Sequence, residues 1–238
     1  MIVRPHYLDL LKTYRDVPLV KILAGIRRCG KSTILEMLRD DLIKSGVPAD
    51  HIIHMRYTSE DFDDGMTDKD MYNGIKEKMT DDERYYLLLD EAFDGLDVVI
   101  RKALKGILVE GVTGRNMTTV IASHNLRELE DLCDSVGLVH NGHMVLSDEV
   151  DSLKSSLHKV QAAFRGVPDV TAFSGLDVIK AERSGSLLQL IVRGDEEEIM
   201  NYINRLSPIF SECIEPSLEE TFVYELEVNG YDVKSIAE

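Results

Sequence analysis

Short apolar runs alternate along the chain with segments whose apolar residues recur at helical spacing. The apolar run at residues 19–24 predicts a buried strand, and residues 32–45 carry their apolar side chains on one helix face before Gly46. Residues 5–14 predict a preceding helix. The same criteria predict strands at 51–57, 85–90, 118–122 and 135–140, and helices at 69–79, 98–110 and 125–133.

The order of these elements predicts the architecture. Strands alternate with helices from residue 19 to residue 140, which is typical of a mainly parallel sheet covered by helices on both faces. Asn141 and Gly142 form a strong hairpin signal before the apolar residues 144–146, so the sheet is expected to end there. We therefore predict an α/β domain over residues 1–157, with a linking helix at 148–157.

The rest of the chain has a different pattern and predicts a second, smaller domain over residues 158–238. It contains elements of both kinds, without the regular alternation of strand and helix. The predicted strands are one at 159–165, a pair around 184–186 and one at 209–214, and the predicted helices are at 196–206 and 217–227. This is a small α+β unit.

Composition narrows the function classes. The chain has 238 residues, with 27 Lys and Arg against 43 Asp and Glu, so its net charge of −16 argues against a nucleic-acid partner. It contains no apolar run of about 18 residues and does not begin like a signal peptide, so we expect a cytoplasmic protein. Its three cysteines have irregular spacing and are expected to be reduced thiols.

A phosphate-binding motif lies between the first strand and the following helix. Residues 25–32 read Gly-Ile-Arg-Arg-Cys-Gly-Lys-Ser, which fits the P-loop pattern G-x-x-x-x-G-K-[ST] in the structural context that this motif requires. Backbone N–H groups at a helix N-terminus bind triphosphate, Lys31 would reach the β- and γ-phosphates, and Ser32 would bind Mg2+. The residues predicted to contact ATP are Gly25, Ile26, Arg27, Arg28, Cys29, Gly30, Lys31, Ser32 and Thr33.

Two features of this loop have alternative interpretations. Arg27 and Arg28 would contact phosphate in one interpretation and face solvent in the other. Cys29 would make the site oxidisable if it were exposed, whereas a buried thiol would be inert.

Two adjacent carboxylates end the apolar strand at 85–90. Asp90 is predicted to hold Mg2+ together with Ser32, and Glu91 to act as the catalytic base that orients the attacking water. His124 closes the strand at 118–122, which lies beside the Asp90 strand in this class of sheet, so its imidazole is predicted to sense the γ-phosphate. The alternative is that His124 only caps the next helix. These residues predict a P-loop ATPase that uses ATP and Mg2+.

From Asp90 onwards the sequence resembles ABC transporter ATP-binding subunits, of the kind that pair with separate membrane permeases. Residues 91–97 resemble the Walker B motif and D-loop, with Ala92 where proline is usual, and residues 123–125 resemble the H-loop. Residues 129–134 and the tail 216–222 also match. The resemblance implies nucleotide contact by Asp97, a permease partner or a homodimer, and a location at the inner face of the cell membrane.

The first 91 residues resemble a different family. Between Lys31 and Asp90 the chain has no glutamine for a Q-loop and no Leu-Ser-Gly-Gly-Gln-type signature. Instead, residues 4–8, 25–32 and 57–64 resemble the N-terminal part of bacterial AAA-like P-loop ATPases. Both families place an extra strand between the Walker A and Walker B strands, so the two parts could join near residues 85–91 without breaking the sheet.

The two resemblances together imply an ATPase that is similar to the nucleotide-binding subunit of an export-type ABC transporter but lacks the helical subdomain and the signature. Since the signature normally completes the partner's site, we expect slow hydrolysis by a homodimer. Two alternatives stay open: an AAA-like ATPase acting on a protein or nucleic-acid partner, and a nucleotide-binding module with little turnover. The sequence does not encode the transported substrate or the permease.

Overall fold

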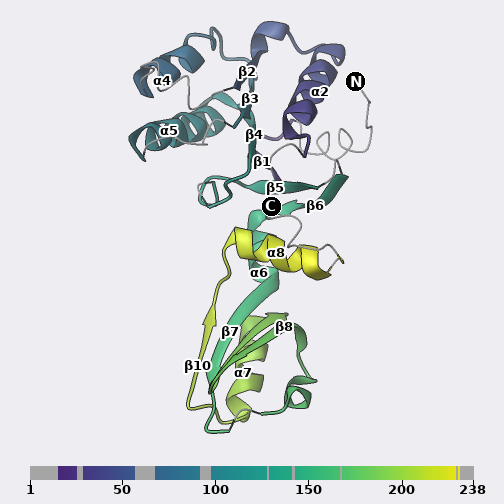
Figure 1. The fold of residues 1–238 in the computed structure, drawn as a ribbon. Coiled ribbons are helices and arrows are strands. Elements are labelled where there is room, and N and C mark those ends of the chain that lie inside the picture. Colours follow the sequence, from purple (N-terminus) through teal and green to yellow (C-terminus); the bar gives the residue numbers. More distant parts are fainter. Residues whose placement is uncertain are drawn as a thin grey trace. The chain divides into compact units, whose positions relative to one another are not determined.

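The computed structural model describes residues 16–25, 29–56, 68–91, 98–127, 129–140, 143–166, 168–228 and 230. The chain divides into two compact units, Met1–Asp148 and Glu149–Glu238 (Figure 1). The helix predicted at 5–14 and the turn predicted at 141–142 lie outside the described residues. In the described part of the chain, no helix is both long and apolar enough to span a membrane.

The first unit contains a six-stranded sheet with the order β2-β3-β4-β1-β5-β6. The pairs formed among the first five strands of this order are all parallel, which confirms the predicted mainly parallel sheet. The strands are β1 (Val20–Ala24), β2 (Ile52–Arg56), β3 (Tyr86–Asp90), β4 (Thr118–Ser123), β5 (Ser135–His140) and β6 (His143–Glu149).

Strand β4 lies between β1 and β3, as the P-loop resemblance implied. Ile22 of β1 pairs with Ile121 of β4, and Leu88 of β3 pairs with Val120 of β4. Because the three strands are parallel, their carboxyl ends meet at one edge of the sheet, where chemical groups on the following loops can converge.

Helices cover both faces of this sheet, as predicted. Figure 1 shows α2 (Lys31–Lys44) on one face, and α4 (Asp68–Lys76) and α5 (Val98–Arg115) on the other. A short 3₁₀ helix, η1 (Ala49–His51), leads into β2. Helix α2 buries an apolar stripe that packs against β3 and β4, which fixes its N-terminus at the carboxyl edge of the sheet.

Two predicted helix bounds need correction. Helix α5 continues to Arg115 instead of ending near Glu110, and the Met117 side chain packs closely against the helix at Gly111. A Cβ atom at Gly111 would lie 2.2 Å from Met117 Cε. The expected helix at 125–133 is wrong, since its described residues form successive turns.

The turns at 125–133 keep the burial that suggested a helix. Leu126, Leu129 and Cys133 are buried at spacings of three and four residues. The segment is held at both ends, where Asn125 N donates to Ser123 Oγ and Asp134 N donates to the carbonyl of Val20. The same apolar spacing is therefore satisfied without a helical ladder.

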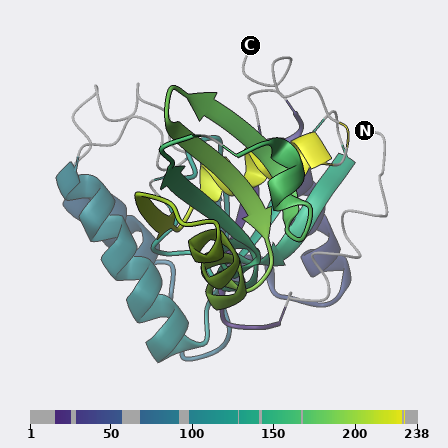
Figure 2. The same ribbon diagram turned by 90° about the horizontal axis from the view of Figure 1, so that it is seen from below.

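The second unit contains a four-stranded antiparallel sheet with the order β10-β7-β9-β8. Its strands are β7 (Leu157–Ala163), β8 (Asp177–Ser184), β9 (Leu187–Arg193) and β10 (Phe210–Ile214). Its helices are α6 (Val150–Ser156), η2 (Val170–Phe173), α7 (Glu196–Arg205) and α8 (Leu218–Val228). Figure 2 shows the green strands of this sheet side by side. This agrees with the predicted α+β content.

The two faces of the second sheet carry different helices. Val160, Leu190 and Val192 belong to a core that includes Ile199 and Ile203 of α7. Residues of the opposite parity, such as Ile191, pack with Tyr224 of α8. The alternation of strand side chains therefore places α7 and α8 on opposite faces of the sheet.

Candidate functional site

The predicted site residues that the structure describes gather at the carboxyl edge of the first sheet. Gly25 follows β1, Asp90 ends β3, and His124 follows β4. Lys31 is the first residue of α2. Ile26, Arg27, Arg28 and Asp97 lie outside the described residues.

Two glycines shape the loop between β1 and α2. Gly25 has φ 153° and Gly30 has φ 106°, both in the region that favours glycine. A Cβ atom at Gly25 would lie 2.3 Å from the carbonyl oxygen of Val139 and 2.7 Å from Cys29 Sγ. The loop therefore needs glycine at position 25 for steric reasons as well as for its backbone conformation.

Cys29 supports the buried-thiol interpretation. The residue is buried under the loop, and this burial raises the pKa of its thiol, while the neighbouring Lys31 ammonium opposes the change. Because the thiolate is the reactive form, a raised pKa keeps Cys29 in its unreactive protonated form at neutral pH.

Lys31 is 4% exposed and points back into the loop. Its Nζ donates a hydrogen bond of 2.7 Å to the carbonyl oxygen of Gly25. An ammonium group within a loop of backbone N–H groups at the start of a helix forms a strongly electropositive anion site.

Ser32 and Asp90 form the second element of the site. Ser32 Oγ donates to Asp90 Oδ1 over 3.1 Å, although the residues lie on α2 and β3. Adjacent oxygen ligands of an octahedral Mg2+ with bonds of about 2.1 Å lie about 3.0 Å apart. The two oxygens therefore fit neighbouring positions around Mg2+, and Asp90 is 3% exposed, so its carboxylate is held in place.

Arg56 is a site residue that the sequence reasoning missed. It ends β2, where its register partner is Asp90, and its Nε lies 3.8 Å from Asp90 Oδ2. The side chain of Arg56 is 64% exposed and so can reach beyond the carboxylate. The signal that the sequence offered was a cationic residue at the carboxyl end of a predicted strand.

Glu91 has a constrained backbone. Its φ of 53° lies in the left-handed region, and its N–H donates to the carbonyl oxygen of Ala122 over 2.9 Å. Non-glycine residues in this region carry strain that often accompanies a functional constraint. The bond to Ala122 continues the β3–β4 pairing by one residue beyond Asp90, and the Glu91 side chain is half-buried at the edge of the sheet.

His124 is exposed and follows β4, the strand next to β3. The preceding Ser123 is buried and accepts a hydrogen bond from Asn125 N through its Oγ, which fixes the turn at His124. Thr33 is exposed on the first turn of α2. The structure thus brings Lys31, Ser32, Asp90, Glu91 and His124 to one edge, while their catalytic roles stay predictions.

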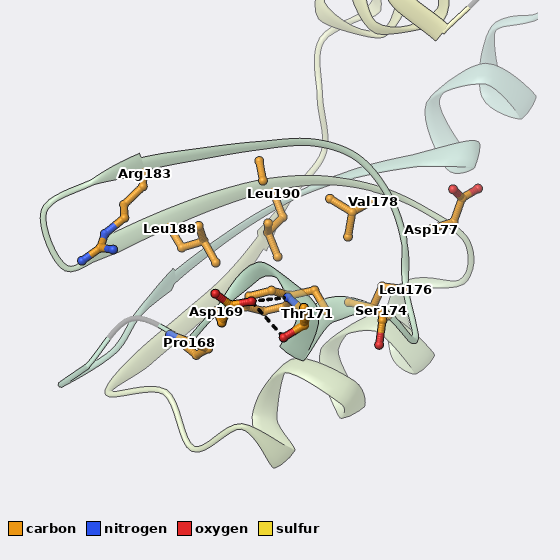
Figure 3. Close-up of a pocket in the computed structure, with 12 residues that line it drawn as sticks. Pro168, Asp169, Thr171, Ser174, Leu176, Asp177, Val178, Arg183, Leu188 and Leu190 are labelled. Atoms are coloured by element: carbon orange, nitrogen blue, oxygen red, sulfur yellow. Dashed lines mark hydrogen bonds between the residues drawn. The ribbon is translucent and has the colours of Figure 1, made fainter.

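A separate cavity lies in the second unit (Figure 3). It has a volume of about 700 Å³ and lies between η2 and the β8–β9 hairpin, with Leu188 and Leu190 on its wall. The polar groups of Asp169 and Thr171 bond to each other at 2.9 and 3.0 Å, as the dashed lines in Figure 3 show.

Comparisons with known proteins identify the family of the first unit. A family model described as an AAA domain matches residues 18–136, from just before β1 to the beginning of β5. The ABC transporter ATP-binding protein YtrB of Bacillus subtilis is 28% identical over 138 residues, which are 58% of this chain and 47% of that protein. The bacitracin transport ATP-binding protein BcrA of Bacillus licheniformis is 37% identical over 73 residues, or 31% of this chain and 24% of that protein.

A solved structure of cbiO1 from Clostridium perfringens, part of the ABC transporter complex cbiONQ, superposes with a TM-score of 0.42 and 16% identity. The superposition covers 58% of this chain and 79% of that one. The chain spans less than half the length of the curated relatives described above. Since the AAA match covers half of the chain and includes the loop, β3 and β4, this chain belongs to the AAA domain family of P-loop ATPases, with sequence similarity to ABC transporter ATP-binding proteins.

Proposed function

We propose that the chain binds Mg-ATP at the carboxyl edge of its first sheet and hydrolyses it slowly. The observation that carries this proposal is the 3.1 Å contact between Ser32 and Asp90, next to a lysine that is folded into the glycine loop. The phosphate site and the magnesium site meet at the N-terminus of one helix. A nucleoside triphosphate with its bound metal requires this arrangement.

Each residue has a separate task in this proposal. When ATP binds, Lys31 Nζ donates its hydrogen bond to phosphate oxygens instead of the carbonyl oxygen of Gly25. Ser32 and Asp90 would hold Mg2+. The metal neutralises the charge that develops on the phosphates. Glu91 orients the attacking water, and His124 donates a hydrogen bond to the γ-phosphate.

Slow turnover follows from what the interval between Lys31 and Asp90 lacks. The interval contains neither a glutamine nor a Leu-Ser-Gly-Gly-Gln-type signature, so a second copy of this chain brings no such signature to the γ-phosphate. Electrostatic groups of this kind commonly contribute factors of about 10² to 10³ in rate. A homodimer of this chain therefore binds ATP but hydrolyses it slowly.

The partner in this proposal is a membrane permease. YtrB is an ABC transporter ATP-binding protein and BcrA a bacitracin transport ATP-binding protein. By analogy, this chain would act in the cytoplasm at the inner face of the cell membrane. The net charge of −16 disfavours nucleic acid as the partner.

A second candidate is an AAA-like ATPase that acts on a protein or nucleic acid, and the AAA match over residues 18–136 favours it. The two candidates share the ATP site and differ in what stimulates turnover. Stimulation of hydrolysis by single- or double-stranded DNA would favour the AAA-like candidate with a nucleic-acid partner, whereas an unchanged rate would exclude that partner.

The decisive experiment measures Mg-ATP affinity by calorimetry and steady-state hydrolysis on the same samples. Lys31→Ala is expected to weaken ATP binding by about 10- to 100-fold, because a charge-assisted hydrogen bond contributes about 1.5–3 kcal/mol. Glu91→Gln is expected to keep binding and to abolish the residual turnover. Lys44→Ala, at the exposed far end of the same helix, is the matched control.

Two results would contradict this proposal. Equal ATP affinity in Lys31→Ala and the unmodified chain would exclude the ATP site. A turnover above about 10 s⁻¹, the median of ordinary enzymes, that is lost in Glu91→Gln would exclude slow hydrolysis while leaving the ATP site intact.

A further inference from the structure

Three side chains with different ligand atoms converge in the second unit. They are the imidazole of His158 on β7, the carboxylate of Glu196 on α7 and the thiol of Cys213 on β10, and one ligand atom of each lies within 4.8 Å of the other two. The residues are 17 or more positions apart in sequence, so no local motif announces them.

The strand register explains why His158 meets Cys213. Cys213 pairs with Val160 across the antiparallel β7–β10 ladder. Side chains alternate between the faces of a strand, so His158 lies on the same face as Val160 and is the diagonal neighbour of Cys213. Val160 and Cys213 both pack in the core beneath α7, which identifies this face as the one that α7 covers.

Helix α7 brings Glu196 over the same place. Asp195 caps the helix by accepting a hydrogen bond of 3.0 Å from Glu198 N, which fixes the first turn that carries Glu196. Further along the helix, Asn204 Oδ1 accepts a hydrogen bond of 2.8 Å from Ser211 Oγ, which ties α7 to β10. The position of the carboxylate relative to the two strands is therefore set at both ends of the helix.

The three groups suit a thiophilic divalent metal. Imidazole nitrogen, thiolate sulfur and carboxylate oxygen are the ligands that Zn2+ takes, whereas a thiolate disfavours Mg2+ and Ca2+. Tetrahedral ligands at about 2.0–2.3 Å from Zn2+ lie about 3.5 Å apart, which small side-chain rotations reach from within 4.8 Å. Among the described residues, these side chains make no hydrogen bond or ion pair that would compete with binding of a metal ion.

We propose that His158, Glu196 and Cys213 form a zinc-binding site with three protein ligands. Glu196 is exposed, so the fourth coordination position faces solvent and takes a water molecule. The site links β7, β10 and α7, and the bound ion stabilises the second unit. The zinc site belongs to the second unit and shares no residue with the ATP site of the first unit, so zinc binding needs no ATP.

The test titrates the full chain with Zn2+ in competition with a chromophoric chelator, in excess Mg2+ that occupies oxygen-only sites. The expected result is one Zn2+ per chain and a rise in the melting temperature of the second unit. With Co2+ as a probe, we expect a sulfur-to-cobalt charge-transfer band in the near ultraviolet. Cys213→Ser should abolish this band, and His158→Gln and Glu196→Gln should weaken Zn2+ binding by at least about 10-fold.

Matched controls make the result specific. Cys133→Ala removes a buried thiol of the first unit, and Glu197→Gln removes an exposed carboxylate next to Glu196, so both should keep the full affinity. Circular dichroism checks that each variant is folded, and Lys31→Ala should bind Zn2+ normally. The proposal is overturned if the unmodified chain binds Zn2+ no more tightly than a variant that combines His158→Gln, Glu196→Gln and Cys213→Ser, or if the cobalt band persists in Cys213→Ser.

Discussion

The two sheets of this molecule use their strands in opposite ways. Every residue of β1, β3 and β4 in the first unit is buried, since helices cover both faces of the parallel sheet. In the second unit, β7 contains both buried and half-buried residues, and β8 is mostly exposed. A strand that is buried on both faces offers chemistry only at its ends, whereas an antiparallel strand can carry reactive side chains along its length.

The candidate sites follow this difference. Lys31, Ser32 and Asp90 gather where parallel strands end, whereas His158 and Cys213 lie within strands of the second sheet. The candidate site residues therefore lie at strand ends in the first unit and within strands in the second unit.

The largest expected effect tests whether the two cores are separate. Leu88 and Leu190 are buried on central strands of the first and second sheet, in different apolar clusters. Leu88→Ala and Leu190→Ala should each lower the free energy of unfolding of their own unit by about 2–5 kcal/mol, because each leaves a cavity. Scanning calorimetry should show two transitions, of which each variant shifts one.

The control for this pair is Ile43→Ala. Because the Ile43 side chain is 45% exposed, this substitution should lower the free energy of unfolding by less than about 0.5 kcal/mol. If either core variant moved both transitions equally, the two units would unfold as one and the comparison would fail.

A smaller effect, of opposite sign, is expected from Lys21 in the fully buried strand β1. Burial lowers the pKa of Lys21 to about 8, which the nearby Asp134 carboxylate only partly offsets. The unfolded state therefore binds more protons between about pH 8 and 10.5, so the free energy of unfolding should rise with pH over this range. At pH 7 the cost of burying the charge is fully present.

Lys21→Met should therefore stabilise the first unit at pH 7 by about 1–2 kcal/mol, less than the pKa change alone suggests, because the bond from Nζ to Val17 O is lost. That carbonyl oxygen stays satisfied by Thr118 Oγ1 at 3.0 Å. Urea unfolding at pH 7 and pH 9.5 measures the effect, with Lys44→Met as control. A variant less stable than the unmodified chain at pH 7 would show that the Lys21 hydrogen bond outweighs desolvation.

The smallest effect concerns the partly exposed sheet of the second unit. Ser217 and Glu220 form a capping box at the start of α8, and Glu220 also accepts a 2.8 Å hydrogen bond from Lys159 of β7. This bond from Lys159 is the main cause that lowers the pKa of Glu220, so its contribution is present above about pH 4.5 and is lost as the pH falls through the lowered pKa.

Lys159→Met should cost about 0.5–1 kcal/mol at pH 7 and progressively less as the pH falls through the lowered pKa of Glu220, compared by urea unfolding with the control Lys154→Met, which removes a different surface pair. A cost that does not decrease as the pH falls would mean that packing of the lysine stem, and not its charge, links β7 to α8.

The sequence predicted those features that depend on local pattern. The apolar run before Gly25, the helix after Lys31 and the carboxylate at Asp90 each follow from neighbouring residues, and their shared edge follows from parallel strands. The turns at 125–133 were missed because apolar spacing alone does not distinguish a helix from turns held by Ser123 and Asp134.

Other features depend on pairing that no local pattern encodes. Arg56 reaches Asp90 because β2 lies next to β3 in register, and Cys213 reaches His158 because β10 pairs with β7. Sequence separation hides both contacts until the order of strands in each sheet is known.

Strand β4 acts as a spacer that sets the distance between the two sides of the proposed ATP site. Neighbouring strands of a sheet lie about 4.8 Å apart, so β4 holds β1 and β3 at about twice that distance. This spacing comes from backbone hydrogen bonds, including the one from Glu91 N to Ala122 O, and not from the identity of side chains. Any strand that pairs in parallel with both β1 and β3 therefore preserves the distance that ATP and its metal must match.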